Sequence, residues 1–155
     1  MSAYYLDSSA IVKRYVRERG SAWVVSITDI GAQNEVLTTL MSGAEVVAAI
    51  CKSGRTGSIT PQDVVKALAT FKSEFRTHFV VINISDQTVD SAMTLAEKHG
   101  LRGYDSVQLA TALELKAEQD LTNAASPLIF VGGDNKLNAA AQAEGLLVEN
   151  PNNHP

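Results

Sequence analysis

The stretch Ala3-Tyr4-Tyr5-Leu6-Asp7-Ser8-Ser9-Ala10-Ile11-Val12 predicts a short apolar strand that ends in a carboxylate and passes at once into an amphipathic helix. Ser8 or Ser9 is suited to cap this helix, because a hydroxyl oxygen there can accept a bond from a free backbone N–H group. In α/β proteins, ligands bind outside the carboxyl ends of parallel strands. Asp7 therefore has two interpretations, a simple helix cap or one wall of a polar site.

The composition is that of an ordinary globular protein with one domain: 155 residues, of which 45% are hydrophobic and 19% charged. No apolar run approaches the roughly 18 residues that span a bilayer, and the first residues lack the pattern of a secretory signal. The single cysteine, Cys51, cannot form an internal disulfide. We therefore expect a cytoplasmic protein that does not enter a membrane.

The net charge is −4, from 13 basic and 17 acidic residues. A protein that coats nucleic acid through a basic surface would be strongly cationic, so the charge argues against this class. An enzyme that reaches nucleic acid through bound cations is compatible with the same charge, because acidic residues would hold those cations.

Strand and helix patterns alternate along the chain. Residues 35–41, 79–84, 127–131 and 146–148 are rich in strand formers, like the opening stretch, and helices are expected between them. This alternation predicts a single α/β domain over residues 1–149, with a mainly parallel sheet of about five strands and helices on both faces. Residues 117–126 are expected to form a loop, and the polar residues 150–155 a loose tail.

Local signals also place several helix boundaries. Gly20 is expected to end the first helix, and Ser21 to cap the second. Ser42 followed by Glu45 has the spacing of a capping box, in which the glutamate reaches back to the backbone of the cap residue. Thr60-Pro61 and Ser85 are typical starts of two further helices.

Four acids stand at the beginnings of helices. Asp7, Glu45 and Asp134 each follow a predicted strand, and Asp105 opens a helix that is entered from a turn at Gly103. Each has a capping or helix-dipole explanation of its own. In a parallel sheet, however, the three that follow strands would meet at one edge, where carboxylates repel one another unless cations lie between them.

Hard oxygen ligands of this kind suit Mg²⁺ or Mn²⁺, which lower the pKa of bound water and stabilise charge on a phosphodiester. A zinc site is disfavoured, because His78, His99 and His154 have no partners at ligand spacing. The chain also lacks a Gly-rich phosphate loop followed by Lys and Ser or Thr, and a Gly-x-Ser-x-Gly nucleophile motif.

Four blocks of sequence then carry a family resemblance: YLDSSAIVK at 5–13, AEVVAA at 44–49, LRGYDSVQLATA at 101–112 and FVGGDNKLNAAA at 130–141. In this order and spacing, they make the chain resemble a PIN-domain ribonuclease, specifically a VapC-type toxin of a type II toxin–antitoxin pair. The resemblance covers nearly the whole chain, and the third block is its most specific part.

The resemblance implies a PIN-like fold and an endoribonuclease that depends on Mg²⁺ or Mn²⁺. Carried over by position, Asp7, Glu45, Asp105 and Asp134 are the catalytic and metal-binding acids. Family members usually form homodimers and are silenced by a cognate antitoxin protein whose C-terminal segment covers or enters the acidic site. Their RNA substrates commonly belong to the translation machinery.

The chain departs from the family at Gly132, where the family often has Ser or Thr two residues before the last acid. Ser9 is a candidate for a nearby replacement hydroxyl. Arg14, Arg17 and Arg102 are candidate phosphate contacts. Because of Gly132, an alternative stays open: a catalytically weak or inactive PIN-fold module that binds RNA or a protein. A phospho-acceptor or phosphatase domain is disfavoured, since the acid pairs typical of that class are absent.

Overall fold

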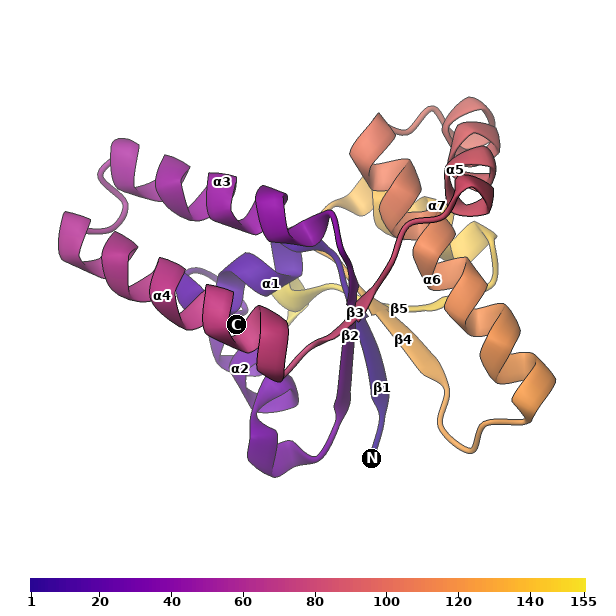
Figure 1. The fold of residues 1–155 in the computed structure, drawn as a ribbon, viewed down its shortest axis with the longest axis horizontal. Coiled ribbons are helices and arrows are strands. Elements are labelled where there is room, and N and C mark those ends of the chain that lie inside the picture. Colours follow the sequence, from indigo (N-terminus) through magenta and orange to yellow (C-terminus); the bar gives the residue numbers. More distant parts are fainter.

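A computed structural model describes residues 1–155 and contains one sheet of five parallel strands. The strands are β1 (Ala3–Leu6), β2 (Glu35–Thr39), β3 (Val80–Ile82), β4 (Leu128–Val131) and β5 (Leu147–Glu149), in the spatial order β3-β2-β1-β4-β5 (Figure 1). The parallel α/β architecture predicted from the sequence is confirmed. The opening stretch supplies the central strand, β1, and every other strand is placed relative to it.

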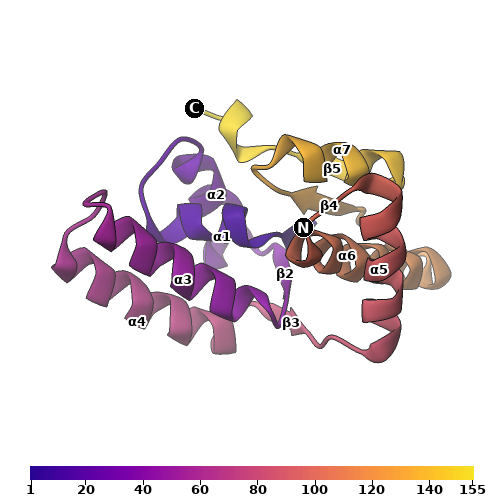
Figure 2. The ribbon, with the colours of Figure 1, turned by 90° about the horizontal axis from the view of Figure 1, so that it is seen from above.

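Seven α-helices flank the sheet. They are α1 (Ser8–Tyr15), α2 (Ser21–Thr28), α3 (Ser42–Arg55), α4 (Pro61–Thr77), α5 (Asp86–His99), α6 (Gly103–Thr122) and α7 (Asn135–Ala143). Two short 3₁₀ helices, η1 (Ile30–Ala32) and η2 (Pro151–Asn153), complete the chain. Helices α1 to α4 gather on one side of the sheet and α5 to α7 on the other, as the view from above shows (Figure 2). No helix is both long and apolar enough to cross a membrane.

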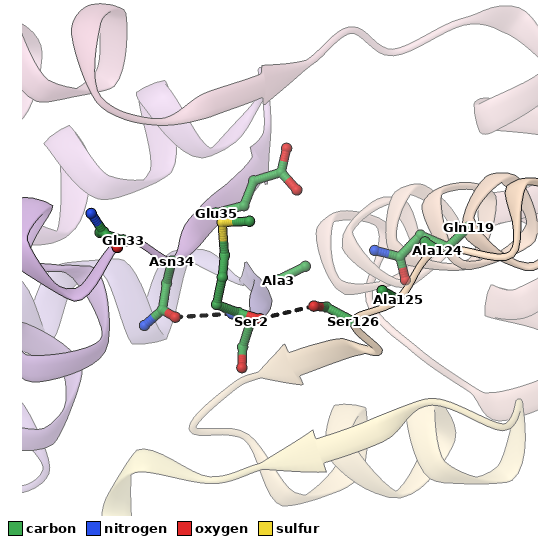
Figure 3. Close-up of a pocket in the computed structure, with 10 residues that line it drawn as sticks. Ser2, Ala3, Gln33, Asn34, Glu35, Gln119, Ala124, Ala125 and Ser126 are labelled. Atoms are coloured by element: carbon green, nitrogen blue, oxygen red, sulfur yellow. Dashed lines mark hydrogen bonds between the residues drawn. The ribbon is translucent and has the colours of Figure 1, made fainter.

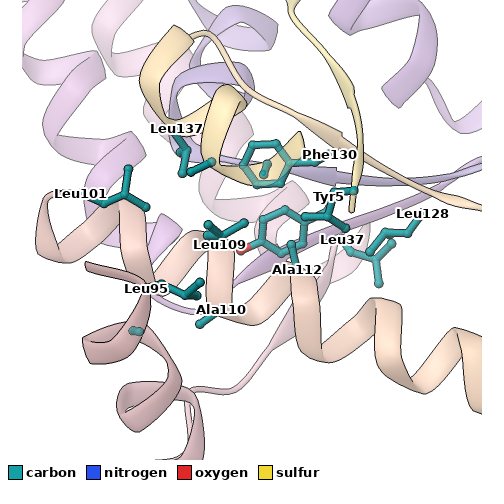
Figure 4. Packing of buried hydrophobic residues seen from close by; sticks show 14 of the residues in the cluster. Tyr5, Leu37, Leu95, Leu101, Leu109, Ala110, Ala112, Leu128, Phe130 and Leu137 are labelled. Carbon is teal, nitrogen blue, oxygen red and sulfur yellow. The ribbon is translucent and has the colours of Figure 1, made fainter. Parts of the chain in front are cut away.

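The register of β1 explains how the two faces are covered. Tyr5 pairs with Leu37 on β2 and with Phe130 on β4, so these three side chains share the face covered by α5, α6 and α7 (Figure 4). The rings of Tyr5 and Phe130 stack with their centroids 5.7 Å apart. Successive strand residues point to opposite faces, so Leu6 packs on the side of α1 to α4. Burial of each large side chain contributes about 1.5–3 kcal/mol to stability.

Two predicted helix starts are confirmed, and the first one needs correction. The side chains of Thr60 and Ser85 cap α4 and α5 by accepting bonds from backbone N–H groups. At α1, neither Ser8 nor Ser9 is the cap: Asp7 takes this position, and its side chain accepts a bond from the N–H group of Ala10. The carboxylate holds the cap position because it directly follows the last strand residue.

The boundary between the first two helices was also predicted wrongly. Helix α1 ends at Tyr15, and Gly20 lies directly before α2 with a φ of 83°. A Cβ atom at Gly20 would stand 2.3 Å from the carbonyl oxygen of Pro151, so this close approach requires glycine. Ser21 does not cap α2; its hydroxyl accepts a bond from the N–H group of Glu18 and holds the preceding loop.

Two segments expected to be irregular are ordered. Helix α6 continues to Thr122 through much of the predicted loop 117–126, supported by a Lys116–Asp120 ion pair one turn apart. The polar ending is not loose: it forms η2, and its Asn152 accepts a bond from the buried Lys13 ammonium. Both segments are polar because they lie at the surface, and surface polarity alone does not distinguish a loop from an exposed helix.

Helices α1 and α4 are joined by a partly buried ion pair between Arg14 and Glu74. The guanidinium donates two bonds of 2.8 Å to the two carboxylate oxygens, and the Tyr15 hydroxyl donates a third. These bonds hold the pKa of Glu74 below its ordinary value of 4.5, with the bond from Arg14 as the largest cause. The pair therefore stabilises the fold only while Glu74 is ionised.

We predict that Glu74→Gln destabilises the protein by about 2 kcal/mol at pH 7, because it removes a charge-assisted bond pair. Since the folded-state pKa is lowered, the contribution of Glu74 is present above its unfolded pKa and is lost as pH falls through the folded value. Urea unfolding should therefore show the difference between variant and wild type narrowing from pH 5 toward pH 3. Glu97→Gln, at an exposed site, is the control; a difference independent of pH would contradict the prediction.

Candidate active site

The four acids singled out in the sequence line one cleft of about 530 Å³ at the carboxyl edge of the sheet. Asp7 directly follows β1, and Asp134 follows the neighbouring strand β4. The chain runs outward from β1 through β2 to β3 and then returns to β4 on the other side, so β1 and β4 form the switch point at which α/β proteins bind ligands. Glu45 arrives from α3 and Asp105 from the first turn of α6.

Asp7 is the most buried of these acids, with only 4% of the residue exposed. One of its oxygens, Oδ1, accepts bonds from the Ser9 hydroxyl at 2.6 Å and from the N–H group of Ala10 at 2.9 Å. Burial raises the pKa of Asp7 to about 6; these two bonds oppose the rise, and the charges of Asp105 and Glu45 add to it. Capping therefore occupies one oxygen of Asp7, and the other remains for the cleft.

Glu45 does not close the predicted capping box, because α3 is preceded by Met41 and has no side-chain cap bond. The Glu45 carboxylate instead accepts bonds from the Ser8 hydroxyl at 2.9 Å and from the Gln108 amide at 3.0 Å. Both donors lie in other elements of the fold. The side chain is thus drawn across to α1 and α6, toward the cleft.

Gln108 is a buried residue whose side chain contacts several polar groups of the site, and it was not predicted from the sequence as a site residue. Its Oε1 accepts a 2.7 Å bond from the Tyr5 hydroxyl, and its Nε2 lies 3.0 Å from oxygens of Ser8, Ser42 and Glu45. Burial raises the pKa of Tyr5, so its hydroxyl stays protonated and acts as a donor. This fixes the orientation of the amide, with its N–H groups toward Glu45. The one available signal was a polar residue three positions after Asp105 on a mostly apolar helix face.

Asp105 and Asp134 lie nearer the surface. Asp105 is 21% exposed in its side chain and accepts a 3.1 Å bond from Arg102, which is 80% exposed. Asp134 caps α7 by accepting a 2.8 Å bond from the N–H group of Leu137. As at Asp7, a single carboxylate can serve both a helix terminus and the cleft.

Of the three candidate phosphate contacts, the structure brings only Arg102 to the acidic cleft. Arg14 is held by Glu74, and Arg14 and Arg17 line a separate hollow beside α4. Two lysines that the sequence reasoning did not select, Lys13 and Lys52, also line the cleft.

The Ser9 hydroxyl joins the two strand ends that form the cleft. It donates to Asp7 and accepts a 2.9 Å bond from the N–H group of Gly133 on the loop after β4. The Ser9 hydroxyl therefore lies close to the loop that carries Gly132, where the sequence predicts that it replaces the missing hydroxyl.

The donors around the cleft fit a hydrated divalent cation. The titratable ligands are carboxylates only, and none of the three histidines nor Cys51 lines the cleft. No group of three or more His, Cys, Asp or Glu side chains is placed to hold a metal ion by itself. An ion here would be coordinated by one or two carboxylates and would keep water molecules as its other ligands, which is how Mg²⁺ is usually bound. A buried acceptor without a protein donor, Asn138 Oδ1, lies with Asp7 Oδ2 beside Gly132 and adds to this fit.

A second hollow of similar volume lies at the opposite edge, where the strands begin (Figure 3). It contains a single carboxylate, Glu35, and two of its polar side chains are already bonded: Asn34 accepts from the N–H group of Ser2, and Ser126 donates to the carbonyl oxygen of Met1. The convergence of acids is therefore a property of the carboxyl edge alone.

Fold and site together define an α/β protein with a carboxylate-lined cleft at the switch point of a parallel sheet. The PIN domain family matches residues 4–141, so the chain belongs to this family. Ribonuclease VapC45 of Mycobacterium tuberculosis is 27% identical over 148 residues, covering 96% of this chain and 95% of the relative.

Two solved structures share the fold at lower identity. FitAcB from Neisseria gonorrhoeae has a TM-score of 0.62 at 16% identity and covers 96% of this chain and 97% of its own. A toxin–antitoxin complex from Klebsiella pneumoniae has a TM-score of 0.52 at 20% identity, with coverage of 96% and 97%. These likenesses agree with the five-stranded parallel architecture.

The raised pKa of Asp7 predicts that this carboxylate costs stability when ionised in metal-free buffer. Its folded-state pKa of about 6 exceeds the ordinary 3.8, so stability falls as pH rises from about 4 to about 6 and is then constant. Asp7→Asn keeps a good cap and loses this penalty. Chemical unfolding should show the variant more stable than wild type above pH 6, by up to about 3 kcal/mol, and equal to it near pH 4.

The exposed Asp90→Asn is the control for this measurement. Equal stability of Asp7→Asn and wild type at every pH would show that Asp7 is not desolvated as the structure indicates.

Proposed function

We propose that this protein is an endoribonuclease that hydrolyses RNA phosphodiester bonds with the help of Mg²⁺ or Mn²⁺. The observation that carries the proposal is the convergence of Asp7, Glu45, Asp105 and Asp134 on one cleft at the switch point of the sheet. Membership of the PIN domain family and the full-length similarity to a ribonuclease support the same activity.

Asp7 and Asp105 are proposed as the principal ligands of the cation. Glu45 binds it directly or through water and helps to orient the attacking water, and Asp134 assists a second cation or a water. When bound, the cation supplies a water of lowered pKa and stabilises the charge that develops on the phosphate. The pKa of Asp7 is raised mainly by burial and further by the charges of Asp105 and Glu45, and a bound cation would offset both effects, which supports this assignment.

The neutral and basic side chains have separate roles in this proposal. Gln108 and Ser8 hold the Glu45 carboxylate in one orientation, because each donates to it. Arg102, Lys13 and Lys52 line the cleft and place positive charge near the RNA backbone, although Lys13 is largely occupied by its bonds to Asn152 and to the carbonyl oxygen of Arg19. Arg14, held by Glu74, is assigned to the fold rather than to phosphate.

We further propose that the protein is the toxin of a toxin–antitoxin pair, silenced by a cognate antitoxin protein, and that it acts as a homodimer in the cytoplasm. The similarity to a VapC ribonuclease and the shared fold with a toxin–antitoxin complex support this role. The acidic cleft is open to an antitoxin segment, and basic side chains of such a segment would pair with its carboxylates.

A second candidate function is a PIN-fold module that binds RNA or a protein without cleaving RNA. Gly132 favours it, because no hydroxyl stands at that position beside Asp7. Cleavage of RNA by the wild-type protein separates the two functions.

We predict that Asp7→Asn and Asp105→Asn each leave a folded protein and lower Mg²⁺-dependent RNA cleavage by more than about a hundredfold, because each removes a charged ligand. The measurement is the rate of cleavage of a structured RNA with and without Mg²⁺, beside circular dichroism of each variant. Asp90→Asn, remote from the cleft, should cleave like the wild type. Full activity of either cleft variant would refute the assignment of that acid.

We also predict that Gln108→Leu slows cleavage by about tenfold to a hundredfold, because it releases Glu45 and removes an orienting partner. The substitution should lower kcat and weaken Mg²⁺ binding. A loss of folded protein alone would lower the total cleavage activity of the sample and leave the Mg²⁺ affinity unchanged. Tyr5→Phe, which frees the amide to turn over, should show a smaller loss of the same kind. Unchanged Mg²⁺ affinity in both variants would count against this role.

A further inference from the structure

Asn138 on α7 carries a buried oxygen that no protein group satisfies. The residue is 7% exposed, and its Oδ1 has no hydrogen-bond partner. Buried acceptors are normally paired, and one that is not calls for a specific explanation. Asn138 is not one of the residues to which a catalytic role is assigned.

The orientation of the Asn138 amide is fixed by the backbone. Its Nδ2 donates a 2.8 Å bond to the carbonyl oxygen of Gly132. Turning the amide over would place Oδ1 against that carbonyl oxygen, so the observed orientation is the favourable one. Oδ1 then faces the position that a Cβ atom of residue 132 would occupy.

Gly132 leaves that space open to Asp7 as well. A Cβ atom at position 132 would lie 2.8 Å from Asn138 Oδ1 and 3.0 Å from Asp7 Oδ2. A Cβ atom there would push at least one of these side chains aside, so glycine lets both oxygens approach the same side of its backbone. Because Asp7 Oδ1 is taken by Ser9 and Ala10, Oδ2 is the oxygen that remains for a ligand.

Two acceptor oxygens that face one volume need a donor or a cation between them. A hydrated divalent cation supplies both, since its charge attracts the carboxylate and its water can donate to the amide oxygen. We propose that Asn138 is a positioning residue of the cation site: its Oδ1 accepts a hydrogen bond from the hydration shell of a divalent cation held by Asp7, and the absence of a side chain at Gly132 leaves room for this contact. This role rests on the proposed function, because it needs the cation.

The test is calorimetric titration of the metal-free protein with Mn²⁺, which does not depend on RNA cleavage. We expect Asn138→Ala to bind Mn²⁺ about tenfold more weakly than wild type, as loss of an outer partner of a metal site commonly does. Gly132→Ser should have a similar effect, because its side chain displaces the amide oxygen. The double variant should be no weaker than either single variant, since both changes remove the same interaction.

Asn34→Ala is the matched control for loss of stability. Asn34 also donates its Nδ2 to a backbone carbonyl, that of Ile27, but it lies at the opposite edge of the sheet (Figure 3). This variant should melt earlier than wild type and bind Mn²⁺ unchanged. Thermal melts of all variants ensure that affinities are compared between folded proteins.

Wild-type affinity in Asn138→Ala would overturn the role of Asn138, as would an additive loss of about a hundredfold in the double variant. If Asp7→Asn abolishes Mn²⁺ binding while Asn138→Ala does not change it, the inference fails and the proposed function stands. Absence of Mn²⁺ binding by the wild-type protein would contradict both.

Discussion

The burial of the Asp7 carboxylate beside other acids is the constraint on which the site depends. Asp7 directly follows the central strand, so the parallel sheet places it at the edge to which the residues after β2 and β4 also come. Burial and the charges of Asp105 and Glu45 raise its pKa to about 6. A divalent cation in the cleft would stabilise the folded protein, because its charge offsets the desolvation of the ionised Asp7 carboxylate and its repulsion from the other acids.

Uncharged side chains and backbone groups fix the orientation of the residues around these acids. Tyr5 is part of the core, and its hydroxyl orients the amide of Gln108 by donating a hydrogen bond to it. The amide in turn donates a hydrogen bond to Glu45. The Asn138 amide is likewise oriented by its bond to the carbonyl oxygen of Gly132. In both cases an amide is oriented by a group that carries no charge, so the geometry of the cleft is tied to the packing of the sheet and not only to the balance of charges.

The fold was largely predictable because strand periodicity and turn residues are local signals. The convergence of Asp7, Glu45 and Asp134 was predictable as well, since parallel strands bring the residues that follow them to one edge. Contacts between distant parts of the chain could not be read in the same way. Arg14 looks free in the sequence, and only the fold brings Glu74 to it across 60 positions. The bond from Gln108 to Ser8 spans 100 positions and was missed for the same reason.

Gly132 was interpreted from the sequence as the loss of a hydroxyl, whereas the structure shows that its small size admits an amide oxygen. We propose that the acidic cleft holds a divalent cation at Asp7. Anomalous X-ray scattering from crystals grown with Mn²⁺ tests it most directly. We expect a strong anomalous peak beside the free oxygen of Asp7, within reach of Asp105 or Glu45. No peak in the cleft at saturating Mn²⁺, or a peak only elsewhere on the protein, would contradict it.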